Sequence, residues 1–438
     1  MCLDKIYFRF FGCFATVVVF VLLFIVQVSA LFAQSLTVDS YVEQVLDYSS
    51  ALKSSQNMIA KSQYEYEELR RNFYPRLDAA ITAAYAFKDS YIIEGLDIKR
   101  LSTTAELNLS QNIYSGSLIR SSVEAAGFQS DIARYGEILT TEKVSVAARS
   151  LYWNAVAAEK YREVAYDYLE IIEKTYNLID IKYRDGLLSK NDLLLMLSRK
   201  KEAQFSLTKA EKNYSRALTD LNILRGTKAN ELVEFVDSVE VAEGVIIPAL
   251  VEPSIVMQQR NEYNISLLGV RQSESLLKIN RAQYLPKIAI GVSGNYGTAI
   301  LNVDNTLSVD GATFLKITAP IFGWGMKRQR KFADLAAINM AQNSLAEQQD
   351  NIRKDIYDSY SSLSESYEQL QLTKESLMIA SESLELSNFS YDEGVISTVE
   401  LLSAQLSWIS AYNSKIGANL GYRISLIIYN QAVCRGDL

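Results

Sequence analysis

Four segments of the chain alternate between apolar and polar side chains. Residues 76–88 carry an apolar residue at nearly every second position, and residues 101–114 repeat the pattern after a polar loop. The same alternation returns at about 287–297 and 312–322. A period of two is typical of β-strands that have one apolar and one small or polar face. The pattern therefore predicts four strands, arranged as two hairpins.

A helical pattern precedes each hairpin and ends at a proline. Pro75 stands directly before the first predicted strand, and Pro286 stands directly before the third. Proline disfavours helical geometry in the residue that precedes it, so we expect both lead-in helices to end at these points. The first lead-in helix is predicted to run without a break from about Thr37 to Phe73.

A very long segment without proline follows each hairpin, at residues 117–183 and 326–391. At 1.5 Å per residue, each segment would form a helix about 100 Å long. The second segment carries apolar residues at intervals of seven, namely Ile356, Leu363, Leu370, Leu377, Leu384 and Tyr391. Such heptads indicate helices that supercoil around their neighbours. Each helix is expected to turn at a glycine and return, forming an antiparallel coiled-coil hairpin.

The sequence contains two copies of one unit. Around Gly186 it reads Tyr-Arg-Asp-Gly-Leu-Leu-Ser-Lys-Asn-Asp-Leu-Leu, and around Gly394 it reads Tyr-Asp-Glu-Gly-Val-Ile-Ser-Thr-Val-Glu-Leu-Leu. The tyrosine, glycine, serine, acid and leucine pair recur 208 residues apart. Upstream, the two lead-in prolines are 211 residues apart. Glycine suits a helix tip because it adopts positive φ without steric cost.

Residues 1–33 have the features of a signal peptide. Two basic residues are followed by an apolar run and then by small residues, which is the order that a signal peptidase requires. Cleavage is expected after Ala33 or Ala30. The alternative is an uncleaved membrane anchor, since the apolar stretch is almost long enough to span a bilayer.

The rest of the chain divides into three parts. Residues 34–225 form the first repeat and residues 254–438 form the second. Between them, residues 226–253 hold two prolines and a cluster of acidic side chains. We interpret this segment as a short linker that packs on the side of the helices, with its charges in solvent.

Composition excludes several classes of function. The chain has 438 residues, a net charge of −7 and no histidine. An acidic chain is a poor candidate for binding nucleic acid. The lack of histidine excludes His-dependent triads and His metal sites, and we expect no enzyme activity, cofactor or metal. Once residues 1–33 are removed, Cys434 is the single cysteine, so no intrachain disulfide can form.

Four strands of this length could cross an outer membrane when tilted. They cannot close a barrel alone, and an open sheet edge in lipid would leave backbone groups unpaired. Three copies would supply twelve strands, which lies in the range known for membrane barrels. The alternative is a soluble four-stranded sheet packed on helices.

Taken in order, these motifs resemble the outer membrane efflux protein family, the TolC family, over essentially all of the chain after residue 33. The resemblance implies a mainly α fold with a transmembrane β part. It implies a homotrimer whose 12-stranded outer-membrane β-barrel is continued by a periplasmic α-helical barrel. Such a protein is a passive conduit in a tripartite efflux or type I secretion system of a Gram-negative bacterium. Its partners would be outer membrane lipid, a periplasmic adaptor (membrane fusion) protein and an inner-membrane pump or ABC transporter.

The resemblance also places a periplasmic gate at the helix tips. The candidate residues are Tyr183, Gly186, Asp192, Tyr391, Gly394 and Glu400. Tyr391 and Asp192 match positions that help to hold the family's entrance closed, and Glu400 matches an acid that lines it. The family's gating arginine has no counterpart, because Ile396 stands at its position. The alternatives are that both acids cap the returning helices and that Tyr391 only continues the heptad.

Aromatic residues near the strand ends could form a girdle at the membrane interface, and Tyr114 and Phe322 are the best candidates. Ordinary packing is the alternative. A different function also stays open, namely a periplasmic coiled-coil adaptor or scaffold protein anchored by its N-terminal segment. Such a protein would carry one helical hairpin, so the duplication argues against it.

Overall fold

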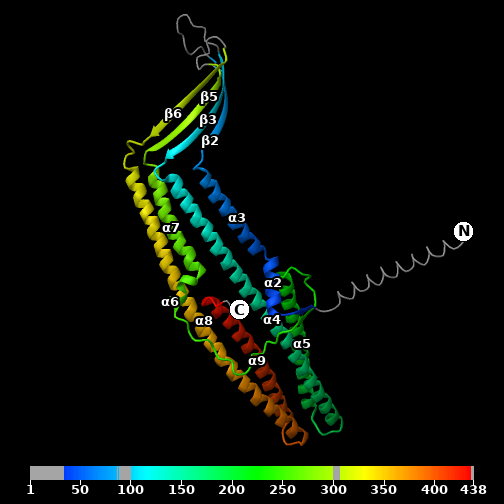
Figure 1. Ribbon diagram of the computed structural model, residues 1–438. Helices are drawn as coiled ribbons and strands as arrows, with labels where there is room; N and C mark the ends of the chain where they lie inside the picture. Colours follow the sequence, from blue (N-terminus) through cyan, green and yellow to red (C-terminus); the bar gives the residue numbers. More distant parts are fainter. Residues whose placement is uncertain (1–33, 86, 88–99, 299–305, 436–438) are drawn as a thin grey trace, which may run out of the picture. The chain divides into compact units, whose positions relative to one another are not determined.

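The computed structural model describes residues 34–85, 87, 100–298 and 306–435 (Figure 1). The predicted signal peptide lies outside these ranges. The chain divides into two compact units. One, which we call the strand unit, comprises Ala51–Thr140 and Glu252–Lys354. The other, which we call the tip unit, comprises the described residues 34–50, Thr141–Val251 and 355–435.

Six of the helices in the described ranges form three pairs of equal length, as expected for a duplicated chain. The pairs are α3 (Ser50–Arg71) and α7 (Asn261–Ala282) with 22 residues, α4 (Leu118–Arg184) and α8 (Met326–Asp392) with 67, and α5 (Lys190–Leu224) and α9 (Thr398–Ala432) with 35. Helices α4 and α8 begin 208 positions apart, whereas α3 and α7 begin 211 positions apart. These are the same two offsets that the sequence motifs show.

Within the described ranges, no helix is both long enough and apolar enough to span a lipid bilayer.

The lead-in helix of the first copy is interrupted, which differs from the continuous helix predicted over residues 37–73. Helix α2 (Val38–Tyr48) and α3 are separated at Ser49, whose ψ of 114° lies outside the helical region. Two consecutive serines stand at the break, and a serine hydroxyl competes for the backbone hydrogen bonds of a helix. The break assigns α2 to the tip unit and α3 to the strand unit.

Short elements that the sequence did not predict lie at the start of the first repeat and around the segment between the two repeats. Strand β1 (Gln34–Leu36) pairs in parallel with β4 (Val233–Phe235). Helix α6 (Pro253–Val256) and the 3₁₀ turn η1 (Met257–Gln259) then lead into α7. Elements of three or four residues are too short to show a periodic pattern of apolar positions.

The strand unit contains one four-stranded antiparallel sheet, in the order β2-β3-β5-β6 (Figure 1). Its strands are β2 (Arg76–Tyr85), β3 (Leu101–Tyr114), β5 (Lys287–Gly297) and β6 (Ser308–Thr318). The first hairpin and the second hairpin are therefore joined through β3 and β5, and β2 and β6 form the two edges.

Three of the strands lie where the alternating pattern predicts them, although residues 86 and 88 of the first lie outside the described ranges. The fourth lies about four residues earlier than the predicted 312–322. Its pairing ends where Thr318 lies opposite Lys287, the first residue of β5. Pro320 follows and has no N–H to donate, so the apolar residues after it do not extend the strand.

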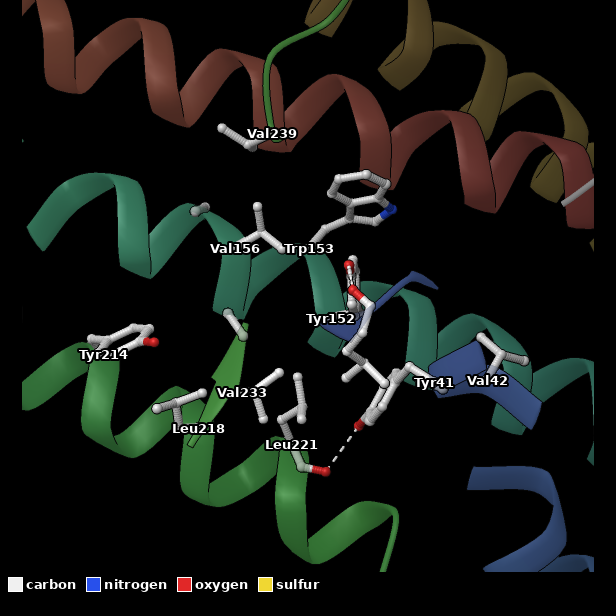
Figure 2. Packing of buried hydrophobic residues seen from close by; sticks show 14 of the residues in the cluster. Tyr41, Val42, Tyr152, Trp153, Val156, Tyr214, Leu218, Leu221, Val233 and Val239 are labelled. Atoms are coloured by element: carbon white, nitrogen blue, oxygen red, sulfur yellow. Dashed lines mark hydrogen bonds between the residues drawn. The ribbon is translucent and has the colours of Figure 1, made fainter. Parts of the chain in front are cut away.

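The tip unit has a hydrophobic core in which α2, α4, α5 and β4 meet (Figure 2). Tyr41 and Tyr152 are fully buried there. The Tyr41 hydroxyl donates a hydrogen bond to the carbonyl of Leu221 (3.2 Å), which satisfies the polar end of a buried ring. The core thus anchors the N-terminal helix to both arms of the first helical hairpin.

Candidate functional site

The first tip ends in a defined backbone turn. The N–H of Leu187 donates to the carbonyl of Lys182 (2.8 Å), and the N–H of Gly186 donates to the carbonyl of Tyr183 (3.0 Å). This pair of bonds is the Schellman motif, which requires a left-handed residue at the helix end. Gly186 supplies it with φ of 74°.

The second tip repeats this turn atom for atom. The N–H of Val395 donates to the carbonyl of Ser390 (2.8 Å), and the N–H of Gly394 donates to the carbonyl of Tyr391 (3.1 Å). Gly394 has φ of 73°. The duplicated motif in the sequence therefore specifies a duplicated hairpin geometry.

Both returning helices begin with a capping box. Asp192 accepts from the N–H of Ser189 (3.2 Å), and the hydroxyl of Ser189 accepts from the N–H of Asp192 (3.3 Å). Glu400 accepts from the N–H of Ser397 (2.7 Å), and the Ser397 hydroxyl accepts from the N–H of Glu400 (3.3 Å). The two predicted gate acids are thus also caps, and this orients both carboxylates at the tips.

The cap changes the ionisation of Glu400. The backbone N–H of Ser397, followed by its hydroxyl, holds the pKa of the Glu400 carboxyl below its usual value. Hydrogen bonds to the charged form favour that form. Glu400 is therefore a carboxylate at neutral pH.

Tyr391 differs from its counterpart in the first copy. Its side chain is only 4% exposed, whereas Tyr183 is half-buried. The Lys182 ammonium lies 4.5 Å from the centroid of the Tyr391 ring, and the Tyr391 hydroxyl lies 3.4 Å from that of Thr398. Tyr391 is thus held between the second hairpin and the end of α4 in the first.

The Tyr391 ring belongs to a buried group that we call the tip cluster. Its members are Tyr168, Ile172, Ile179, Met196, Ala203, Tyr391, Leu401 and Leu402. They come from all four helices of the two hairpins, and Ile396 packs against them. An apolar contact therefore stands where the family would place a gating arginine.

A polar bridge lies in the same region and was not predicted from the sequence. The side-chain amide of Gln405 on α9 donates to the hydroxyl of Thr175 on α4 (2.9 Å), and both side chains are buried. The signal that could have revealed it is a glutamine on the buried face of a helix, since such groups need partners.

The sheet has one apolar and one polar face. Residues directly opposite each other on neighbouring strands share a face. The register places these side chains on one face: Leu77, Ile81, Tyr85, Leu107, Leu109, Ile290, Val292, Tyr296, Val309, Leu315 and Ile317. They are strongly exposed, from 43% for Leu109 to 86% for Ile81.

The opposite face is mostly polar. It carries Asp78, Thr82, Glu106, Asn108, Ser293, Asn295, Asp310 and Lys316. Phe314 is an exception, since it lies opposite Gly291 on this face. Its ring occupies the space that a Cβ at Gly291 would need, so the glycine gives the aromatic side chain a place against the sheet.

The predicted girdle residues occupy different positions. Tyr114 is the last residue of β3, as predicted. Phe322 does not end a strand, because β6 stops at Thr318. It lies instead in the turn before α8, 74% exposed, with its ring packed edge-on against Trp324 at 4.8 Å. The girdle itself stays a prediction.

The helix-to-strand prolines lie where the sequence places them. Helix α3 ends four residues before Pro75, and α7 ends four residues before Pro286. A turn of i→i+3 hydrogen bonds links each helix to its proline. Strands β2 and β5 start immediately afterwards.

We compared the sequence and the structure of the chain with those of known proteins. Residues 259–428 match the family model described as "Outer membrane efflux protein". No curated protein sequence matches the chain.

Several solved structures are similar to the chain. CusC superposes with a TM-score of 0.79 at 15% identity, over 92% of this chain and 93% of CusC. The outer membrane protein VceC from Vibrio cholerae gives 0.76 at 15%, over 90% of this chain and 95% of VceC. The MtrE outer membrane channel of Neisseria gonorrhoeae gives 0.74 at 18%, over 90% of this chain and 88% of MtrE.

At these identities the structural matches establish the fold, and the family model covers most of the second repeat. The resemblance to the outer membrane efflux protein family is thereby confirmed, in sequence over residues 259–428 and in the mainly α, duplicated fold of nearly the whole chain.

Proposed function

We propose that this protein is the outer-membrane channel of a tripartite efflux or type I secretion system, acting as a passive conduit. The observation on which this proposal depends is the structure of the sheet, whose apolar face is exposed along its whole length while its other face is mostly polar. That arrangement suits lipid on one side and a water-filled lumen on the other. The match to the efflux family supports it.

The two edges of the sheet support a homotrimer. Strands β2 and β6 each have one neighbour in the described sheet. In lipid, an unpaired backbone group costs several kcal/mol, so both edges must be paired. Three copies joined edge to edge give a closed 12-stranded barrel, which the long helices would continue as an α-helical barrel in the periplasm.

The tips are the proposed gate. Tyr391 and the tip cluster hold the two hairpins of one protomer together. Asp192 and Glu400 present carboxylates at the starts of the returning helices. In a trimer, three copies of Glu400 would form a ring that favours cations.

The proposed location is the outer membrane of a Gram-negative bacterium, with the helices reaching into the periplasm. The proposed partners are a periplasmic adaptor protein and an inner-membrane pump or ABC transporter, which would engage the tips. A conduit needs such partners because it has no energy source of its own.

Planar-bilayer recording tests the channel and its gate together. The wild-type trimer should conduct ions weakly, and Tyr391→Ala should raise the conductance several-fold by releasing the second hairpin from Lys182. Tyr183→Ala is the matched control, because the half-buried Tyr183 should contribute less to closure. Inserted trimers that pass no current would contradict the channel, and equal effects of the two variants would contradict the gate.

A further inference from the structure

A basic cleft lies between α7 and α8, next to the start of the sheet. Its volume is about 540 Å³. Five cationic side chains line it, namely Arg281, Lys327, Arg328, Arg330 and Lys331, together with the single carboxylate of Asp334. All of these residues belong to the strand unit.

The one carboxylate is already engaged. Asp334 is buried, accepts a hydrogen bond from the side-chain amide of Asn280 (2.9 Å) and pairs with Nε of Arg330 (3.1 Å). Arg330 thus neutralises Asp334, and none of the other four cationic side chains of the cleft forms an ion pair with this carboxylate.

Those four cations keep their charge free for a ligand. In the part of the chain that the structure describes, no ion pair involves Arg281, Lys327, Arg328 or Lys331. Arg328 lies 5.6 Å from the centroid of the Phe332 ring. Positive side chains crowded around one cleft repel one another unless an anion sits between them.

The surroundings indicate where such an anion would come from. Trp324, two residues before α8, is 87% exposed and packs on Phe322. Tyr284 lines the cleft and stands three residues before β5. Aromatic rings beside Lys and Arg at the end of a membrane-spanning segment are typical of the headgroup region.

We propose that this cleft binds the phosphate of an anionic phospholipid in the periplasmic leaflet of the outer membrane. Arg281, Lys327 and Lys331 would form charge-assisted hydrogen bonds to the phosphate oxygens. Trp324 and Phe322 would lie against the glycerol and the first part of the acyl chains. This inference rests on the proposed function in one respect, namely that the sheet lies in the outer membrane.

Native mass spectrometry of the detergent-purified full-length protein tests the site. The probes are phosphatidylglycerol, phosphatidylcholine and inorganic phosphate. The variant is Arg281→Gln/Lys327→Gln/Lys331→Gln, and the matched control is Lys201→Gln/Lys209→Gln/Lys212→Gln on α5, with the same change in charge. We expect wild type and control to prefer phosphatidylglycerol to phosphatidylcholine, and the cleft variant to bind phosphatidylglycerol at least about tenfold more weakly.

Three results would overturn the proposal. They are no preference for phosphatidylglycerol in the wild type, equal losses in the cleft variant and the control, and phosphate binding as tight as phosphatidylglycerol binding. Bilayer currents separate this inference from the proposed function. If the wild-type protein conducts ions normally but shows no preference for phosphatidylglycerol, the lipid site is wrong and the channel stands. If the wild-type protein neither inserts nor conducts, the proposed channel function is wrong.

Discussion

At the scale of single residues, the tips depend on backbone conformations that glycine adopts at low cost. Gly186 and Gly394 both have φ near +74°. A Cβ built on either would meet no heavy atom within 4 Å. Any penalty for a larger residue at these positions therefore comes from the backbone and not from a clash.

Gly394→Ala should destabilise the second tip by about 1–2 kcal/mol, because a left-handed alanine is strained. Gly394→Asn should cost less, since asparagine tolerates this conformation. Hydrogen exchange of the tip amides measures the effect. Gly136→Ala, in the middle of α4 and with free space around its Cβ, is the control and should be neutral or stabilising. Unchanged tip exchange in Gly394→Ala would show that the glycine is not required.

Glu400→Ala should reduce block of the channel by divalent or trivalent cations, because it removes the proposed carboxylate ring. In the wild type, the Ser397 cap lowers the pKa of each Glu400, so block should be present at neutral pH and should be lost as the pH falls far enough to protonate the carboxylates. Ser397→Ala, which removes the hydroxyl of the cap, should move that loss of block to higher pH. Glu385→Ala, on the exposed surface of α8, is the control. Block that is unchanged in Glu400→Ala would exclude the ring.

At the scale of elements, one aspartate of the linker joins three segments. Asp237 accepts from the N–H of Val38 at the start of α2 (2.9 Å) and from the hydroxyl of Tyr152 on α4 (2.8 Å). Burial, and then the bond to Asp237, raise the pKa of Tyr152. Asp237 is therefore not a solvated charge, as its place in an acidic cluster had suggested.

Two other acids of the cluster also hold the linker in place. Glu231 pairs with the buried Arg225 (3.2 Å), and Glu240 pairs with Lys415 on α9 (3.1 Å). The expectation that this segment packs on the side of the helices fits these contacts.

Asp237→Ala should lower the free energy of unfolding of the tip unit by about 1–3 kcal/mol, because it leaves the N–H of Val38 at the start of α2 without its acceptor and removes a charge-assisted bond from the Tyr152 hydroxyl, which keeps the carbonyl of Leu36 (2.8 Å). Glu234→Ala, on the exposed side of β4, should change it by less than about 0.5 kcal/mol. Urea unfolding followed by tryptophan fluorescence measures both, since Trp153 lies beside Tyr152. Equal effects of the two variants would contradict the role of Asp237.

The elements that the sequence predicts are those with long or repeated patterns. The two 67-residue helices, the hairpins and the glycine tips can all be predicted because each pattern spans many residues or occurs twice. The break at Ser49, the β1–β4 pair and the contact between Lys182 and Tyr391 cannot, because they depend on tertiary packing between distant segments. For the tip acids Asp192 and Glu400, the capping box can be predicted because it depends on four neighbouring residues. A gate cannot be predicted in the same way, because the proposed ring of carboxylates needs three chains.

At the scale of the whole molecule, the duplication predicts how neighbouring copies join. Strands β3 and β5 meet at the junction of the two repeats, where Asn108 lies opposite Ser293. The counterpart of Asn108 lies 208 positions later, at Lys316, and the counterpart of Ser293 lies 211 positions earlier, at Thr82. If the junction between protomers repeats the junction within one, Lys316 of one copy faces Thr82 of the next.

Cysteine cross-linking in outer membranes tests this closure most directly. In a Cys434→Ser background, the pair Thr82→Cys and Lys316→Cys should give covalent trimers on a denaturing gel after mild oxidation. The pair Ala83→Cys and Lys316→Cys should not, because residues 82 and 83 point to opposite faces of β2. Covalent trimers from the first pair alone would support a sheet closed by three chains, whereas monomers only, or equal yields from both pairs, would contradict it.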